Sequence, residues 1–373
     1  MTTTLIPILS AIAAAIVVLV LTPVSMWLAG RVGAVDMPSA RRIHTRPIPR
    51  LGGIAIVLGF MLPAAWFLPA DPAVRGLIAG AVLIAALGIV DDILGLSPVV
   101  KLVGQVACAS VPVAAGLMID HITLPFVGPL DLGAAAYVLT VIWFVAIVNI
   151  INFTDGMDGL AAGVVGIGAT TFAIIAASLG RADAAILAAA LAGACIAFLK
   201  YNFNPARTFM GDGGSMFLGF MLAGIAITGV MKSAAAVAIV LPLVVLAIPI
   251  LDTSFVIMKR LKHGLPVYGA DKSHFHHRFL AIGWSQRRTV LSIYAWAGLM
   301  SLLALAMRFV PYTDGHGNWN AGWTLLLAVI AALGLLGAVY LVYILEILKW
   351  RSEPVVNIVR RHREQRTHAT TRS

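Results

Sequence analysis

Long apolar segments constrain this chain more than any other feature of its sequence. Stretches of roughly 17 to 25 residues with few charges recur along the chain, and a helix of that length crosses the hydrocarbon of a membrane. Hydrophobic residues make up 60% of the 373 residues and charged residues 11%, whereas soluble domains carry about 25% charge. So little polar surface excludes a soluble enzyme, a disulfide scaffold and a disordered protein. We expect an all-α polytopic membrane protein.

Charged residues and Pro/Gly breaks divide the apolar sequence into about 11 expected transmembrane helices. They lie near 5–29, 51–68, 74–90, 99–118, 133–151, 160–179, 184–201, 213–230, 234–251, 289–310 and 322–348. The N-terminus lacks the basic region of a cleavable signal peptide. We therefore expect one integral membrane domain over residues 1–349, followed by a basic cytoplasmic tail over residues 350–373 that is attracted to anionic membrane lipids.

The distribution of Lys and Arg predicts the orientation of these spans. With the N-terminus outside, every Lys and Arg lies in or beside an inside loop except Arg75, Arg181, Lys232 and Arg308. Basic residues accumulate on cytoplasmic loops, so the N-terminus is expected outside and the C-terminus in the cytoplasm. The net charge of +10 then needs no nucleic acid partner, and no aromatic–basic interleaving indicates one. In the outside segment 119–132, a Gly128–Pro129 turn between β-prone runs predicts a small external β-hairpin.

Five carboxylates gather on the predicted cytoplasmic face: Asp91, Asp92, Asp155, Asp158 and Asp212. An ionised carboxylate beside an apolar segment is costly without a partner, so the group predicts a bound divalent cation. The alternative is that these residues cap helix N-termini. For Asp158 that alternative is equally good, but capping explains at most one member of the adjacent Asp91–Asp92 pair.

Glycines surround two of these motifs. Asn152-Phe-Thr-Asp155-Gly-Met-Asp158-Gly combines an amide, two carboxylates and two glycines, and glycine lets backbone N–H groups approach a ligand. Phe209-Met-Gly-Asp212-Gly-Gly-Ser215 places a carboxylate in a glycine-rich loop that opens a helix, which suits anions or metal-bridged phosphates. Asn202 belongs to the same inside loop.

Two basic inside loops complete the candidate site. In residues 41–53, His44, Arg50 and the Gly52–Gly53 pair favour contact with phosphate, although a plain positive-inside signal is the alternative. The loop 252–288 carries His274, His276, His277 and Arg278. We interpret these as hydrogen-bond donors for a diphosphate or a sugar. A zinc site is the alternative, but no thiolate accompanies the histidines.

In this order, the Asp91–Asp92 pair, the Asn152 and Phe209 motifs and the histidines resemble the polyprenyl-phosphate N-acetylhexosamine-1-phosphate transferases over residues 44 to about 280. The resemblance implies ten or eleven helices in the bacterial cytoplasmic membrane, with the active site facing the cytoplasm. It also implies transfer of a phospho-N-acetylhexosamine from a UDP-sugar to undecaprenyl or another polyprenyl phosphate, with release of UMP. The implied cofactor is Mg²⁺, with Mn²⁺ as a substitute.

The resemblance also implies a role for each matching residue. Asp212 becomes the principal Mg²⁺ ligand and Asn152 the second, while Asp91 and Asp92 handle the lipid phosphate, one of them accepting its proton. Uridine recognition falls to Asp158, Asn202 and Phe209, the last by stacking on uracil. The further substrate-binding candidates are Asp155, His44, Arg50 and the group that contacts the diphosphate or sugar, His274, His276, His277 and Arg278.

The segment Asp271-Lys-Ser-His-Phe-His-His277 decides the expected branch. Pentapeptide transferases are expected to carry Pro-x-His-His-His, so the segment favours a UDP-GlcNAc enzyme that initiates a cell-envelope polysaccharide. Because Lys272 stands where that branch often has Arg, other UDP-N-acetylhexosamines stay open, as does a phospho-N-acetylmuramoyl-pentapeptide transferase. A secondary transporter is the alternative from another class, although the repeated halves it should show are missing. The oligomeric state, a homodimer included, is also open.

Overall fold

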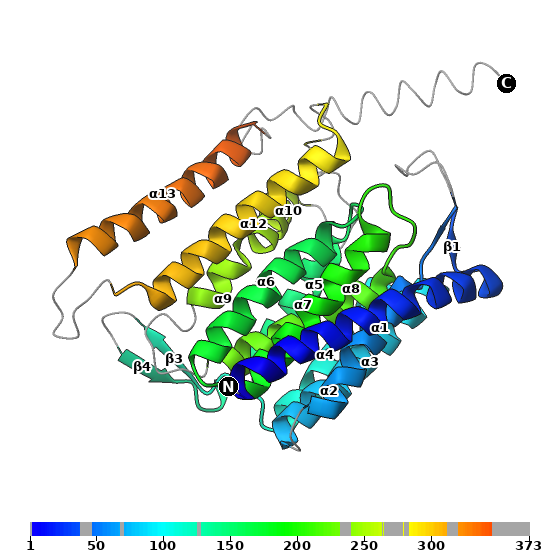
Figure 1. The fold of residues 1–373 in the computed structure, drawn as a ribbon, viewed down its shortest axis with the longest axis horizontal. Coiled ribbons are helices and arrows are strands. Elements are labelled where there is room, and N and C mark those ends of the chain that lie inside the picture. The colour runs from blue at the N-terminus through cyan, green and yellow to red at the C-terminus, as the bar shows by residue number, and fades with distance from the viewer. Residues whose placement is uncertain are drawn as a thin grey trace.

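The chain forms a bundle of long helices that share a common direction (Figure 1). This computed structural model describes residues 2–37, 47–67, 71–124, 128–231, 240–262, 264, 279, 283–311 and 320–344. The helices are α1 (Thr2–Val32), α2 (Gly52–Phe67), α3 (Pro72–Leu94), α4 (Pro98–Ala114), α5 (Ala135–Thr154), α6 (Leu160–Ser178), α7 (Ala182–Asn202), α8 (Gly211–Ala226), α9 (Val240–Val245), α10 (Ala247–Lys262), α12 (Gln286–Phe309) and α13 (Ala321–Ile344). A π-helical turn, Ile227–Met231, continues α8.

Among the described residues, seven helices are long and apolar enough to cross a membrane, and three apolar helices are shorter. Their burial differs: 83% of the apolar window of α8 is buried inside the protein, against 28% of the window of α1. On α1, large apolar side chains such as Ile16 and Val20 are exposed, which is stable where lipid covers them. The prediction of a polytopic helical membrane protein is confirmed; the count of eleven spans and their orientation stay predictions.

The expected span at 234–251 is wrong in its boundaries. The described part of this region contains α9, and then α10, which continues to Lys262 into the segment expected to be an inside loop. Helix α10 is amphipathic, with Ile248 and Val256 buried, and it ends in Lys259, Arg260 and Lys262. Basic residues in a last turn suit the negative end of the helix dipole. Hydropathy ended the span too early because it does not register an amphipathic continuation.

The hairpin predicted in residues 119–132 is confirmed, but its turn is not where the sequence suggested, and its place outside the membrane stays a prediction. Strands β3 (His121–Leu124) and β4 (Gly128–Asp131) pair antiparallel, with Leu124 opposite Gly128 and Thr123 opposite Pro129. Gly128 and Pro129 therefore begin β4 instead of forming the turn. A two-stranded ribbon consists of edges only, and an edge strand tolerates a proline that has no N–H to donate.

A second short ribbon lies at the other end of the bundle. Strand β1 (Val35–Asp36) pairs with β2 (Ile48–Pro49), and the backbone N–H of Phe209 donates to the Pro49 carbonyl at 2.8 Å. The start of α8 is thereby tied to β2. Strands β3 and β4 and the first turn of α1 lie at the opposite end from β1 (Figure 1), as expected for an outside hairpin and an inside site.

Glycines allow α2 and α3 to reach the first turn of α8. A Cβ added to Gly88 of α3 would lie 2.5 Å from the Asp212 carbonyl oxygen, and one added to Gly214 would lie 2.8 Å from the Gly53 Cα. Small residues at helix contacts let backbones approach closely within a membrane. This convergence brings the end of α3, with Asp91 and Asp92, beside Asp212.

Candidate active site

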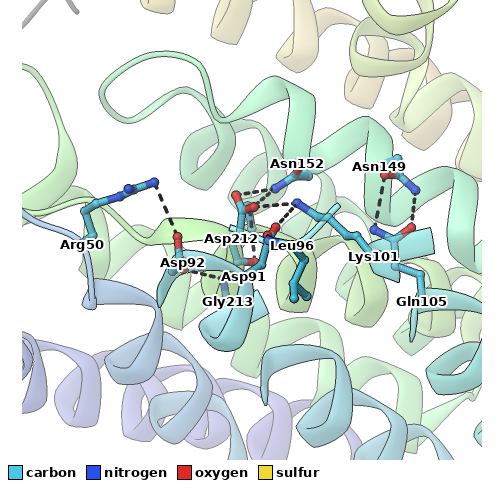
Figure 2. Close-up of polar contacts among 11 residues, drawn as sticks. Arg50, Asp91, Asp92, Leu96, Lys101, Gln105, Asn149, Asn152, Asp212 and Gly213 are labelled. Atoms are coloured by element: carbon cyan, nitrogen blue, oxygen red, sulfur yellow. Dashed lines mark hydrogen bonds and ion pairs between the residues drawn. The ribbon is translucent and has the colours of Figure 1, made fainter. Parts of the chain in front are cut away.

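Asp212, in the first turn of α8, is held between side chains from two other helices. The Lys101 ammonium on α4 donates to Asp212 Oδ2 at 2.5 Å and pairs with Asp91 Oδ2 at 2.7 Å. The Asn152 amide, near the end of α5, donates to Asp212 Oδ1 at 3.0 Å and to Ser215 Oγ at 2.8 Å. Figure 2 shows these side chains converging on Asp212. Four helices therefore contribute to one polar cluster.

Each carboxylate of the Asp91–Asp92 pair also accepts a backbone hydrogen bond at a helix end. Asp91 Oδ1 accepts from the Leu96 N–H at 2.7 Å, in the turn that follows α3. Asp92 Oδ2 accepts from the Gly213 N–H at 3.1 Å, in the first turn of α8. Only Asp92 thereby accepts from a free N–H at a helix N-terminus, that of α8, because Leu96 precedes α4, whose N-cap is Ser97. This agrees with the expectation that capping explains at most one member of the pair. We call Asp91, Asp92 and Asp212 the carboxylate cluster.

The other oxygen of Asp92 faces Arg50. Arg50 Nη2 lies 3.6 Å from Asp92 Oδ1, and its Nη1 lies 3.9 Å from Asp36 Oδ1. Asp92 Oδ1 is buried and has no hydrogen-bond partner among the described residues. This oxygen therefore has lone pairs that can accept a hydrogen bond or a proton. The charge of Asp92 is balanced by the Arg50 guanidinium, whose side chain is 37% exposed.

The glycines near Asp212 serve close packing. Gly211 has φ +69°, and an added Cβ would collide with Asp92 Oδ2 and lie 2.7 Å from the Arg50 carbonyl oxygen. The N–H groups of Gly52 and Gly53 donate to the carbonyls of Phe209 and Met210 at 2.9 and 3.0 Å. The interpretation of the Gly52–Gly53 pair as phosphate-contacting is corrected here, because both N–H groups are already used to join α2 to the α8 loop.

Beside the carboxylate cluster, Asn202 connects two loops. Its Oδ1 accepts from the Gly159 N–H and its Nδ2 donates to the Thr208 carbonyl, both at 3.0 Å. The residue is 2% exposed. Its contact with uridine stays a prediction, and the contacts that the structure gives it hold the loops together.

Asp158 is bonded in the same way. Its Oδ2 accepts from the Asn204 amide at 2.9 Å and from the Ala206 N–H at 3.0 Å, and Asn204 also donates to Gln286 Oε1 at 2.6 Å. Asp158 does not cap α6, whose N-cap is Gly159 without a side-chain bond, so that alternative was wrong. We call Asp158, Asn202 and Asn204 the loop bracket.

Asp155 lies between these two groups and is half-buried. Burial raises the pKa of its carboxyl well above the usual value, and the nearby carboxylates of Asp212, Asp92 and Asp158 raise it further. A cation entering this region would lower that pKa again. Asp155 therefore responds to the charge held by its neighbours.

The structure thus brings together five predicted residues: Asp91, Asp92, Asn152, Asp212 and Arg50. Phe209 is half-buried next to them, in the loop before α8. The predicted contacts of His44, His274, His276, His277 and Arg278 lie outside the described residues, as does the tail 350–373.

Lys101 was missed as a site residue and counted only as an inside charge. The position of Lys101 in the sequence could have indicated its role. It follows Pro98 by three residues in an apolar segment, and burying a charged side chain in such a segment costs free energy and usually serves a function.

The donors of the carboxylate cluster suit Mg²⁺. Mg²⁺ prefers oxygen ligands and is commonly bound by one or two carboxylates together with substrate phosphates. Asp91 and Asp212 supply such oxygens on either side of the Lys101 ammonium. No group of three or more His, Cys, Asp or Glu gathers as a metal site in the part of the chain that the structure describes.

Comparison with known proteins agrees with this geometry. The family model described as Glycosyl transferase family 4 matches residues 74–230, which include the carboxylate cluster, Lys101 and the loop bracket. A probable undecaprenyl-phosphate N-acetylglucosaminyl 1-phosphate transferase of Bacillus subtilis is 40% identical over 293 residues, 78% of this chain and 82% of the relative. The chain belongs to glycosyl transferase family 4.

Two further relatives indicate where the chain stands within family 4. A decaprenyl-phosphate N-acetylglucosaminephosphotransferase of Mycobacterium tuberculosis is 38% identical over 326 residues, 78% of this chain and 80% of the relative. A phospho-N-acetylmuramoyl-pentapeptide-transferase of Moorella thermoacetica is 35% identical over 271 residues, 69% of this chain and 83% of the relative. The predicted superfamily and its GlcNAc branch are confirmed, since the GlcNAc relatives match more of this family 4 chain at higher identity.

Proposed function

We propose that this chain transfers N-acetylglucosamine 1-phosphate from UDP-GlcNAc to a polyprenyl phosphate, undecaprenyl phosphate in the first instance, and releases UMP. One observation carries the proposal: Lys101 and the carboxylate cluster meet at the first turn of α8, at one end of apolar spanning helices. One substrate is soluble in water and the other is dissolved in lipid, so the reaction needs a site at the interface. The names of the Bacillus subtilis and Mycobacterium tuberculosis relatives support the same chemistry.

The reaction joins an oxygen of the lipid phosphate to the β-phosphorus of UDP-GlcNAc. The bond from that phosphorus to the bridging oxygen breaks, and UMP leaves with the bridging oxygen. Phosphoryl transfer is catalysed mainly by positioning and charge stabilisation. Lys101 and Arg50 supply fixed positive charge on the two sides of the carboxylate cluster, at 2.5 Å from Asp212 and 3.6 Å from Asp92.

Asp212 would hold the Mg²⁺, with Asn152 as the second ligand and as the residue that orients Asp212. When bound, the ion would neutralise the diphosphate charge that otherwise repels the incoming lipid phosphate. Asn152 fits this orienting role because its amide donates to Asp212 Oδ1 at 3.0 Å. Mn²⁺, with similar oxygen preference, is the expected substitute.

Within the Asp91–Asp92 pair, the geometry favours Asp92 as the proton acceptor. Both oxygens of Asp91 are engaged, by the Leu96 N–H and by Lys101. Asp92 Oδ1 has no hydrogen-bond partner among the described residues, so its lone pairs can accept a proton from the lipid phosphate. Arg50, 3.6 Å away, is placed to attract the anionic lipid to that oxygen.

For the nucleotide, the proposal retains the uridine contacts of Phe209 and Asp158. Phe209 precedes the Gly211–Asp212 turn and is half-buried, which leaves part of its ring for stacking. Stacking of an aromatic side chain on a base contributes about 1–3 kcal/mol. We expect Phe209→Ala to raise the KM for UDP-GlcNAc about tenfold or more and to leave the KM for the lipid unchanged, as steady-state kinetics on both substrates would measure.

The proposed location is the bacterial cytoplasmic membrane, with the site facing the cytoplasm. The positive-inside distribution supports this orientation, as does the position of β3 and β4 at the end opposite β1 (Figure 1). A cysteine placed at the exposed position Arg207, beside the loop bracket, should react with an impermeant reagent only from the cytoplasmic side.

The test is a transfer assay on purified protein in detergent with undecaprenyl phosphate, UDP-GlcNAc and Mg²⁺. It follows UMP and the lipid-linked sugar, with a chelator and the Asp212→Asn variant as matched controls. We expect both products in equal amounts, and neither in the controls. Turnover with UDP-N-acetylmuramoyl-pentapeptide instead would move the chain to the other branch. If folded protein formed no product with any UDP-sugar, the transferase proposal would be rejected, and the secondary transporter would again be the alternative.

A further inference from the structure

Gln105 and Asn149 form a reciprocal amide pair between α4 and α5. Gln105 Nε2 donates to Asn149 Oδ1 at 3.3 Å, and Asn149 Nδ2 donates to Gln105 Oε1 at 2.6 Å. Asn149 Nδ2 also donates to the Val145 carbonyl at 2.8 Å. Gln105 is 2% exposed. A buried amide without partners is costly, so this pair is satisfied only while the two side chains face each other.

The pair lies one helical turn from the residues that hold Asp212. Gln105 follows Lys101 by four residues on α4, and Asn149 precedes Asn152 by three on α5, spacings that share one helix face. Lys101 and Asn152 bond to the two different oxygens of Asp212. Figure 2 shows the amide pair beside Lys101, on the side away from Arg50.

Toward the bundle, α4 packs on α3, where Gly104 lies against the Leu87 side chain. The outer face of α4 does not fix the register of the helix. Val99 and Val103 are 70% and 64% exposed, on surface that lipid would cover. Lipid contacts are as favourable after a small slide or rotation of the helix as before it, since lipid tails are as apolar as the side chains. Two opposed amide hydrogen bonds are satisfied at one separation and one register only.

We propose that the Gln105–Asn149 pair is a positioning device that sets where Lys101 and Asn152 stand around Asp212. Its catalytic consequence rests on the proposed transferase function, whereas its geometric consequence does not. A misplacement of about 1 Å in a catalytic group can cost about 100-fold in rate. Neither amide contacts substrate in this proposal, and both act through the residues one turn away.

The first test exchanges the two side chains. Gln105→Asn or Asn149→Gln alone changes the length of one partner, whereas the double exchange restores the combined length. We expect each single variant to lower kcat about 10- to 100-fold with the KM for UDP-GlcNAc nearly unchanged, and the double variant to recover most of the rate. Ser110→Ala on the same helix is the control, because its hydroxyl donates to the Val106 carbonyl of its own helix.

The second test does not need activity. In a chain with Cys108→Ala and Cys195→Ala, K101C and N152C report the approach of α4 to α5 through their rate of oxidative cross-linking. Adding Gln105→Asn should change that rate several-fold, and adding Asn149→Gln as well should restore it. An unchanged cross-linking rate overturns the proposal whatever the activity. A changed rate with wild-type kcat overturns the catalytic part. A wild-type chain that transfers no sugar rejects the transferase and leaves the cross-linking result standing.

Discussion

The carboxylate cluster and the loop bracket lie next to each other and contain similar polar residues. The two groups differ in the partners that these side chains bind. In the carboxylate cluster, Asp91 and Asp212 share an ammonium, and Asp92 keeps an oxygen with no hydrogen-bond partner among the described residues. In the loop bracket, the side chains of Asp158 and Asn202 hydrogen-bond to backbone groups, and Asp158 also accepts from Asn204. The partner decides the role: a carboxylate paired with a side-chain ammonium can also bind a metal ion, whereas one bonded to backbone N–H groups holds the chain in place.

The largest expected effect separates the two regions at Asp212. We expect Asp212→Asn to lower transfer by at least about 1,000-fold, since the carboxylate that would hold the metal ion is lost. The isosteric amide keeps the volume, so the melting temperature in detergent should stay near that of the wild type. UMP release measures the rate. Normal turnover would place Asp212 among the structural residues.

Lys101 tests whether the cation is catalytic or only neutralises buried charge. Lys101→Met should lower kcat about 100-fold or more, and Lys101→Arg should retain part of the rate, because the charge returns in a different shape. Lys200→Met is the matched control, since that lysine is exposed and stands over the Tyr201 ring. Equal losses in the Lys101→Met and Lys200→Met variants would argue against a site role for Lys101.

Asn202 should behave in the opposite way from Asp212. Asn202→Ala leaves the Gly159 N–H and the Thr208 carbonyl without their partner, at a cost of about 3 kcal/mol of folding stability. We expect a lower melting temperature and a smaller loss of kcat than in the Asp212 variant. A wild-type melting temperature with a raised KM for UDP-GlcNAc would instead support the predicted contact with uridine.

The smallest effect concerns pH and Asp155. Because the folded protein raises the pKa of this carboxyl, the native state holds its proton more tightly than the unfolded chain, whose Asp pKa is about 3.9. The destabilising contribution therefore grows as the pH rises from that value toward the raised pKa. Without added metal, the melting temperature of Asp155→Asn relative to the wild type should increase between about pH 4 and pH 7. A constant difference across that range would show that Asp155 is not perturbed in the folded protein.

The sequence by itself determined the membrane class, most of the helices and the motifs of the site, because these depend on local composition. Apolar length predicts a span, and Asp91, Asp92, Asn152 and Asp212 stand out as polar residues beside such spans. The motifs also indicated the family correctly. Local pattern was insufficient at α9 and α10, where the helix continues as an amphipathic segment, and at Gly128–Pro129, which begins a strand.

Tertiary structure alone decided which polar atoms face one another. Lys101 and Asp212 are separated by 111 residues in the chain, and no spacing rule joins them. Asp92 on α3 caps the neighbouring helix α8, and the Gly52 and Gly53 N–H groups donate to carbonyls of the loop before α8. These contacts exist because glycines let three helix backbones converge on one turn. Such convergence is a property of packing. It decides which carboxylates are placed to act on a phosphate, those of the carboxylate cluster, and which one holds the loop, that of Asp158.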